Sequence, residues 1–154
     1  MIITNIKMTD TRKYLEHTAD ILFQAQATTL AGLFEQCGFA VEESMTNLSQ
    51  LDESEEREIT GKNTKIDRLL FDFLDDLLFY KDSDLIIFKR FEIKISESKN
   101  EQGQIEYSLH CKAYGEPLQE GKHERIVDVK AITMHMFEVK KTDTGFWAQV
   151  LIDI

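Results

Sequence analysis

The stretch of sequence that decides the fold covers residues 15–30 and reads LEHTADILFQAQATTL. Residues 21–27 are mostly apolar and predict a β-strand. Thr28 and Thr29 follow it and predict the N-cap of a helix, because a threonine hydroxyl can accept a hydrogen bond from the first turn. His17 and Asp20 stand three residues apart at the entrance of this strand. An imidazole and a carboxylate placed so closely are the first candidates for metal or acid–base chemistry.

The helix predicted from Leu30 has one apolar stripe with spacing i, i+3, i+4, i+7. Its members are Leu30, Leu33, Phe34, Cys37, Val41 and Met45. The other side of the helix carries Glu35, Gln36, Glu42 and Glu43. We therefore expect the apolar stripe to face a core and the polar side to face water.

A second and more apolar helix is predicted from a capping-box-like start at residues 64–67 to about Tyr80. It follows a polar loop over residues 47–56 and a short strand near residues 57–60. Its polar side carries Asp72, Asp75 and Asp76, which could form an acidic metal cluster or a solvated helix face. The solvated face is the favoured interpretation, because charge runs on helices usually contact water.

From residue 85 the apolar pattern changes to a period of two, which predicts strands. A long hairpin is expected around residues 91–95 and 105–113, with its turn at residues 100–103. Two further strands are expected at about 127–140 and at 146–152. The predicted fold class is α+β, with two helices packed on a mostly antiparallel or mixed β-sheet. The strand–helix order suggests two related units, and we expect a single domain over residues 1–154.

The composition and charge of the chain disfavour some classes of function. The chain of 154 residues has 18 Lys and Arg against 28 Asp and Glu, a net charge of −10. Direct RNA or DNA binding is disfavoured, because nucleic-acid binding needs a basic face, whereas a partner with a basic surface would be attracted. Without a long apolar run or a signal-peptide pattern, a cytoplasmic protein without membrane contact is expected. Cys37 and Cys111 fit no metal or redox spacing and are expected to be free, buried thiols.

The end of the chain offers partners for Asp20. Asp153 and the main-chain carboxylate of Ile154 place negative oxygen donors one residue apart. If the strand ends meet, three carboxylates converge, and their repulsion favours a bound divalent cation. We expect calcium, with magnesium or manganese as alternatives, whereas His17 as a ligand would favour a transition metal. The residues alone leave open a simpler role, in which Asp20 caps a turn and His17 bonds to backbone.

Several landmarks together resemble the archease family. They are residues 15–21 (LEHTADI), 69–80, 91–93 (FEI), 115–116 (GE), 122–123 (KH), 129–135 (VKAITMH) and 149–154 (QVLIDI). The resemblance implies a small α+β protein that activates an RtcB-type RNA ligase in tRNA splicing by promoting its guanylylation and multiple turnover. It also implies a metal site made by Asp20, Asp153 and Ile154, and a functional role for Lys130. The stretch Met134-His135-Met136 departs from the family pattern, away from that site.

Three functions are thus open, and no catalytic residue is expected under the first. The leading hypothesis is an accessory activator of the ligase, not an enzyme, which acts through a metal-organised acidic tip. The second is a metal-dependent phosphohydrolase that uses Asp20, His17 and Asp153 around a catalytic ion. The third is a general chaperone that binds unrelated clients without dependence on Asp20. No phosphate-binding loop, nucleophile elbow or His-Glu-x-x-His motif occurs in the sequence.

Overall fold

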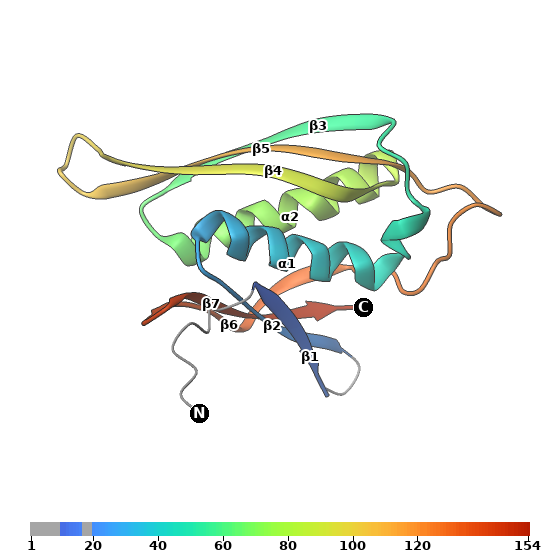
Figure 1. Ribbon diagram of the computed structural model, residues 1–154, viewed down its shortest axis with the longest axis horizontal. Helices are drawn as coiled ribbons and strands as arrows, with labels where there is room; N and C mark the ends of the chain where they lie inside the picture. Colours follow the sequence, from blue (N-terminus) through green and yellow to red (C-terminus); the bar gives the residue numbers. More distant parts are fainter. Residues whose placement is uncertain (1–9, 17–19) are drawn as a thin grey trace, which may run out of the picture.

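The computed structural model describes residues 10–16 and 20–154 as three layers, with two helices between two antiparallel sheets (Figure 1). The elements, in chain order, are β1 (Thr11–Leu15), β2 (Asp20–Ala27), α1 (Leu30–Met45), the short 3-10 helix η1 (Leu48–Gln50), β3 (Glu55–Asn63), α2 (Ile66–Asp84), β4 (Ile86–Lys99), β5 (Ile105–Pro117), β6 (Ala131–Thr142) and β7 (Gly145–Asp153). The α+β class is confirmed.

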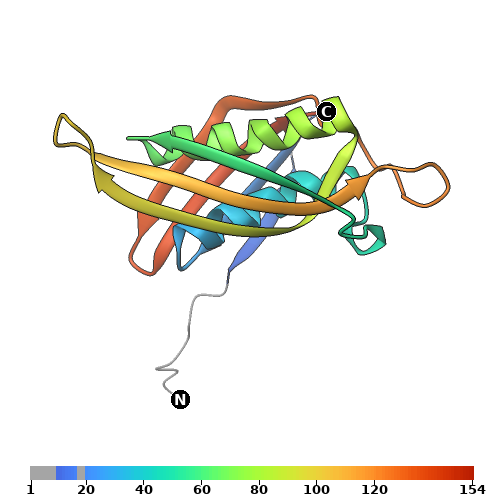
Figure 2. The same cartoon turned by 90° about the horizontal axis from the view of Figure 1, so that it is seen from above.

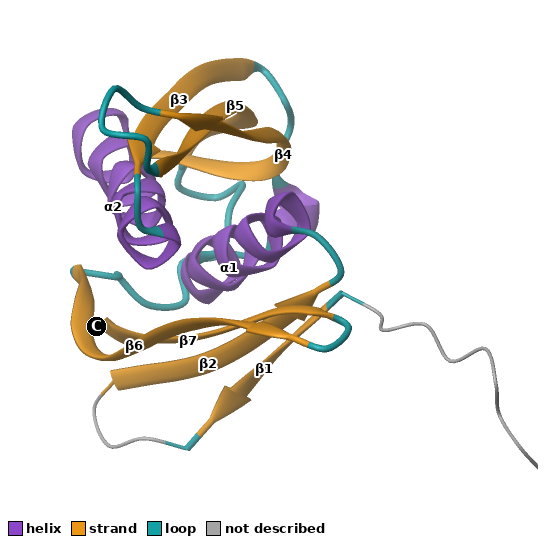
Figure 3. Cartoon of the chain, turned by 90° about the vertical axis from the view of Figure 1, so that its left-hand side faces the viewer, coloured by secondary structure: helices purple, strands orange, loops and turns teal. Residues whose placement is uncertain are grey.

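The strands form two sheets where one had been expected. The four-stranded sheet has the order β1-β2-β7-β6, and the three-stranded sheet has the order β3-β5-β4. All neighbouring strands are antiparallel. Figure 3 shows both helices in the space between the two sheets. Strand followed by helix occurs twice, as β2–α1 and β3–α2, and each pair contributes its strand to a different sheet.

The helix α1 begins as its sequence predicts, with the Thr29 hydroxyl accepting a hydrogen bond from the backbone N–H of Gly32 at 3.0 Å. Its apolar stripe is buried, apart from half-buried Leu30. The expectation that its other side faces water is wrong for Gln36 and Glu42, which are both buried. The physical reasons differ. Glu42 faces the second sheet, because α1 packs against β2 and β7 on one side and against β4 on the other. Gln36 accepts a hydrogen bond from Arg12 of β1, in the four-stranded sheet.

The helix α2 does not start with a capping box. Its N-cap residue is Lys65, whose side chain makes no capping hydrogen bond. The Asn63 side chain instead accepts a hydrogen bond from the Lys65 N–H at 3.0 Å, and the Asp67 carboxylate accepts one from the N–H of Arg68 at 2.8 Å. The helix also continues past Tyr80 to Asp84 and ends at Leu85, which is left-handed with φ 57°.

The β4–β5 hairpin extends beyond the helices and twists across their upper side (Figure 1). The register shifts between Phe88 and Arg90, where the two strands come unusually close. A Cβ on Gly115 would lie 1.9 Å from the carbonyl oxygen of Ile87, so only glycine fits this place. Phenylalanine rings fill the core below the hairpin, and the ring of Phe91 contacts those of Phe73 and Phe88 at centroid distances of 5.9 and 6.3 Å.

Two further boundaries differ from expectation. Strand β1 was not predicted, and β6 begins at Ala131 instead of about Val127. Residues 118–130 form a loop, which projects from the right-hand end of the molecule in Figure 2. Cys37 and Cys111 are buried and unbonded, as predicted. Among the described residues, no helix has the length and apolar character needed to cross a membrane.

Candidate functional site at the Asp20–Asp153 end of the sheet

The structure brings Asp20 and Asp153 together. Asp20 is the first residue of β2 and Asp153 the last residue of β7, and the two are direct partners in the antiparallel register. Directly opposite residues in such a pair project from the same face of the sheet, with Cβ atoms about 4.5–5.5 Å apart. Both are half-buried. Asp20 and Asp153 therefore lie side by side, as the sequence analysis expected of these two carboxylates.

The rest of this end of the sheet comes from β6 and the residue before it. Ala131 is the partner of Asp153 on the β6 side, so a small side chain adjoins the carboxylate. The backbone N–H of Lys130 donates a hydrogen bond to the Asp153 carbonyl oxygen at 2.8 Å. Lys130 is exposed, and its backbone is fixed beside the carboxylate pair. The lysine implied by the family resemblance thus adjoins the aspartates in space.

The other residues that the sequence analysis singled out lie in different places. His17 lies outside the described residues. Ile154 follows Asp153 directly and is partly buried against the core. His135 lies within an irregular part of β6 between Thr133 and Glu138, where it is exposed. That irregularity coincides with the stretch that departs from the family pattern.

The carboxylate pair fits a hard divalent cation. Like charges directly opposite each other on neighbouring strands are destabilising, and a cation between them relieves the repulsion. Within residues 10–16 and 20–154, no group of three His, Cys, Asp or Glu side chains is arranged to hold a metal. Asp20 and Asp153 would therefore need further oxygen donors, such as the main-chain carboxylate proposed at Ile154.

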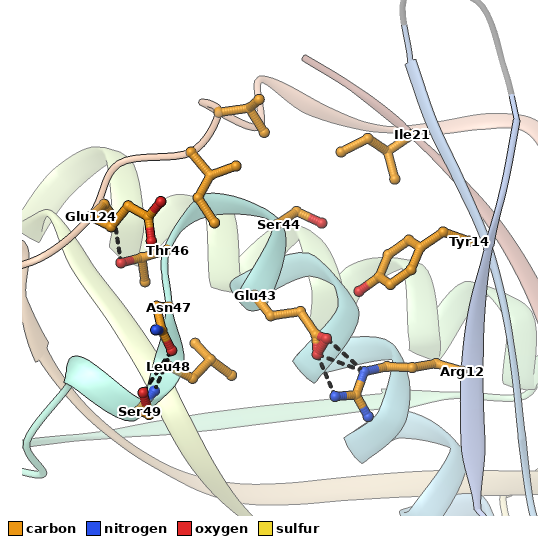
Figure 4. Close-up of a pocket in the computed structure, with 12 residues that line it drawn as sticks. Arg12, Tyr14, Ile21, Glu43, Ser44, Thr46, Asn47, Leu48, Ser49 and Glu124 are labelled. Carbon is orange, nitrogen blue, oxygen red and sulfur yellow. Dashed lines mark hydrogen bonds and ion pairs between the residues drawn. The ribbon is translucent and has the colours of Figure 1, made fainter.

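A groove of about 690 Å³ lies beside this end of the sheet (Figure 4). Ile21, the neighbour of Asp20, lines it together with β1, the end of α1, residues 46–49 and the loop residues Glu124, Ile126 and Val127. On one wall, Arg12 donates hydrogen bonds to Glu43 and, at 2.6 Å, to Gln36. This wall was not predicted from the sequence, because residues 11–15 were not recognised as a strand.

Tyr14, which is 47% exposed, forms part of the same wall. Burial, together with the negative charge of Glu43, raises the pKa of the Tyr14 hydroxyl to about 12. The phenol is therefore neutral at physiological pH and suited to hydrogen bonding, not to proton abstraction.

A buried acid–base pair anchors the loop that leads to Lys130. The His123 ring is fully buried, and its Nδ1 accepts a hydrogen bond from the Gln119 N–H at 2.9 Å. Its Nε2 therefore carries the N–H and donates a hydrogen bond to Glu116 Oε1 at 2.6 Å. Glu116 Oε1 also accepts from the Asp52 N–H at 2.9 Å, and Oε2 from Lys122 Nζ at 3.1 Å. Lys122 and His123 belong to the landmarks of the family resemblance, but nothing in the sequence showed that their partner is Glu116 of β5.

These contacts govern the charge of Glu116. Burial alone would raise the pKa of the Glu116 carboxyl, but the hydrogen bonds from Asp52, Lys122 and His123 outweigh it and lower this pKa to about 2. The carboxylate stays ionised at physiological pH and holds the loop against the sheet.

A second anchor comes from α2. Lys81 Nζ is buried and donates hydrogen bonds to Asp128 Oδ1 and to the Val129 carbonyl oxygen, both at 2.8 Å. It also pairs with Asp82 at 2.6 Å. Burial opposes the charge of Lys81, but its acidic partners raise the pKa of the ammonium group overall. This lysine, which sequence analysis did not single out, joins α2 to the residues that precede Lys130.

Comparison with known proteins identifies the family of the chain. The model of the Archease protein family (MTH1598/TM1083) matches residues 13–154. The chain belongs to the archease family. The match begins in β1 and ends with the last residue, so it includes both Asp20 and Asp153.

Individual archease relatives agree in length and fold. The chain is similar to the protein archease of Pyrococcus abyssi, at 37% identity over 92% of this chain and 97% of that protein. It is 36% identical to the protein archease of Methanothermobacter thermautotrophicus, with the same coverage. The solution structure of Methanobacterium thermoautotrophicum protein 1598 matches with a TM-score of 0.76 and 32% identity, over 93% of this chain and 98% of that one.

Proposed function

We propose that this chain is an accessory activator of an RtcB-type RNA ligase, promoting its guanylylation and multiple turnover. The observation that carries the proposal is the pairing of Asp20 with Asp153 at one end of the four-stranded sheet, in a chain of the archease family. The anchored loop brings Lys130 to the same end.

In this proposal each residue of the site has a defined task. Asp20, Asp153 and the main-chain carboxylate of Ile154 would hold a divalent cation, calcium in the first place. The cation would supply a positive charge that attracts phosphate oxygens. Lys130 would present an exposed ammonium group beside them. The net charge of −10 favours association with a basic, RNA-binding ligase in the cytoplasm over direct RNA binding.

The second hypothesis, a metal-dependent phosphohydrolase, gains no support from the described residues. Its third residue, His17, lies outside the described residues, and the relatives are named archeases. A general chaperone is favoured by no specific observation. Neither is therefore proposed as the function.

The test is a multiple-turnover RNA ligation assay with the purified ligase, GTP and divalent metal. The ligase alone should stop near one turnover, and addition of the chain in catalytic amounts should restore continued turnover. A ligase that gains no turnover from the wild-type chain would contradict the proposal. Phosphatase or nuclease activity of the isolated chain, lost in Asp20→Asn, would instead support the phosphohydrolase.

Metal binding has a separate test that needs no ligase. Calorimetric titration with Ca²⁺, Mg²⁺ or Mn²⁺ should show one site in the wild-type chain. The affinity should fall at least about tenfold in Asp153→Asn, because one charged ligand becomes neutral. Equal affinities in the two chains would remove Asp153 from the ligand set.

A further inference from the structure

The outer face of α2 carries an exposed phenylalanine among carboxylates. Phe79 is 61% exposed, although the other side of α2 is buried in the core. Counted round the helix, Asp72, Asp75, Asp76 and Asp82 all lie within about 60° of Phe79. Figure 3 shows α2 at one side of the helix layer, with its outer side turned away from α1. The solvated-face interpretation of these aspartates is thus correct, but it leaves the large exposed ring unexplained.

Negative charge accumulates on this face. In the described part of the chain, Asp72, Asp75 and Asp76 form no ion pair, and Arg68, one turn earlier, has its guanidinium over the Phe71 ring at 5.9 Å. Burial and the neighbouring charges of Asp75 and Asp72 raise the pKa of the Asp76 carboxyl. The chain thus tolerates repulsion here, a common feature of surfaces that bind oppositely charged partners.

An apolar recess adjoins the C-terminal end of the same helix. It has a volume of about 500 Å³ and lies between α2, the end of α1 and the loop of residues 118–128. Leu85 and Ile126 line it and are 49% and 51% exposed. Its charged residues, Lys81, Asp82, Arg125 and Asp128, balance in sign. The recess is therefore suited to an apolar side chain, whereas the helix face beside it is suited to cations.

We propose that these features form one docking face for a basic protein segment. The α2 docking face comprises Asp72, Asp75, Asp76, Phe79 and Leu85. Lysine or arginine side chains of the segment would lie against the aspartates, and apolar side chains would cover Phe79 and enter the recess beside Leu85. A nucleic acid is disfavoured, because its phosphates would be repelled. The proposal rests on the proposed function only in taking the RtcB-type ligase as the partner that presents this segment.

The helix that carries the docking face is bonded to the candidate site through its opposite, buried side. Lys81 of α2 holds the Val129 carbonyl oxygen at 2.8 Å, and the next residue, Lys130, is bonded to Asp153 through its N–H. We expect the docking face to supply affinity, while Asp20 and Asp153 supply stimulation.

The test measures binding of the purified chain to the ligase, and the chain concentration that gives half-maximal stimulation. Phe79→Ala should raise the Kd about tenfold, as loss of an exposed aromatic anchor does at other interfaces. The triple variant Asp72→Asn/Asp75→Asn/Asp76→Asn should slow association about tenfold and reduce the dependence of binding on salt. Both variants should melt close to the wild type, because in the described part of the chain the three aspartates form no ion pair and the exposed Phe79 ring contacts the ring of the adjacent Tyr80, at 5.4 Å. At saturating concentration, both should stimulate the ligase fully.

Matched controls exist at the tip of the β4–β5 hairpin. Ile105 is 49% exposed, and Glu97, Glu101 and Glu106 surround that hairpin end. Ile105→Ala also shortens an exposed apolar side chain to Ala, and the triple variant Glu97→Gln/Glu101→Gln/Glu106→Gln removes the same number of negative charges. Binding that falls equally in these controls would show a general charge effect and overturn the docking face.

The outcomes separate this inference from the proposed function. A wild-type chain that stimulates the ligase while the α2 variants keep the wild-type Kd would overturn the docking face alone. A wild-type chain that binds through α2 without stimulating the ligase would overturn the proposed function alone. A wild-type chain that does not bind the ligase at all would overturn both.

Discussion

At the scale of single residues, Glu42 is the most unusual group in the core. Its side chain is fully buried in α1, and Oε2 accepts a hydrogen bond from the Phe88 N–H at 2.6 Å, next to the irregularity in β4. Oε1 has no hydrogen-bond partner among the described residues. Burial raises the pKa of the Glu42 carboxyl to about 8, against the opposing effects of the Phe88 hydrogen bond and the charge of Lys81. Glu42 is therefore mostly protonated in the folded chain at neutral pH.

This pKa predicts a specific dependence of stability on pH. Since the folded pKa of Glu42 lies above the unfolded one, its contribution is fully present below about pH 4.5 and is lost as pH rises towards about 8. Glu42→Gln is neutral at every pH and keeps an acceptor for the Phe88 N–H. Relative to the wild type, the variant should gain on the order of 2 to 4 kcal/mol in free energy of unfolding between pH 5 and pH 8. Urea unfolding at both pH values measures this, and parallel curves would refute the assignment.

At the scale of elements, the bulged hairpin depends on Gly115. A Cβ there would meet the Ile87 carbonyl oxygen at 1.9 Å, and two backbones would have to separate. We expect Gly115→Ala to lower the free energy of unfolding by about 3 kcal/mol or more. Gly121→Ala is the control: its φ is 81°, but nothing lies within 4 Å of the added Cβ, so a loss of about 1 kcal/mol is expected. Equal losses in the two variants would contradict the close approach seen at Gly115.

The stability of the chain should also depend on the Glu116–His123 pair, which holds the loop of residues 118–130. Glu116→Ala leaves three buried or partly buried donors without their acceptor, and we expect a loss of about 3 kcal/mol near neutral pH. The folded pKa of Glu116 lies below the unfolded one, so this difference should be full above about pH 4.5 and shrink as pH falls towards 2.

Hydrogen exchange provides a local readout of the same anchor. The Ile126 N–H is bonded to the Met45 carbonyl oxygen at 2.9 Å, and the Lys130 N–H to that of Asp153 at 2.8 Å. Both amides should exchange faster in Glu116→Ala. They should exchange at the wild-type rate in Glu120→Ala, since Glu120 is exposed on the same loop. Unchanged exchange in Glu116→Ala would show that the pair does not position Lys130.

Periodicity predicted the interior elements well, because β2, α1, α2 and the hairpin each bury a regular face. It did not predict β1, whose residues 11–15 alternate little in hydropathy. It also could not show that α1 is covered on two sides, since a pattern identifies a buried face but not the partner that covers it. The burial of Glu42 follows from this second contact. Its carboxyl lies on the side of α1 that the sequence predicts to be polar, and the three-stranded sheet covers that side.

The candidate site was predictable in part for a similar reason. Asp20 and Asp153 stand at the ends of two predicted strands, so their meeting depended only on β2 and β7 being neighbours. The Glu116–His123 pair was not predictable, because it depends on how a loop folds back on β5. Nor was the pairing of Lys81, whose partners come from that loop.

At the scale of the whole molecule, three parts of the chain lie beside one another. They are one end of the four-stranded sheet, the loop of residues 118–130 and the end of α2. That end holds the Asp20–Asp153 pair and exposed Lys130, and the two anchors at Glu116 and Lys81 keep it in place. A rigid acidic end of this kind suits a protein that acts by entering a partner's site, where ordered charges have the largest effect.

The central claim is that this carboxylate pair activates the ligase, and the most direct measurement is the fraction of ligase that carries GMP after its first turnover. With GTP and divalent metal in excess, the wild-type chain should restore guanylylation. Asp143→Asn, a control at the exposed β6–β7 turn, should do the same. Asp20→Asn should leave the GMP-bearing fraction at the level of the ligase alone. Full restoration by a folded Asp20→Asn chain would contradict the account.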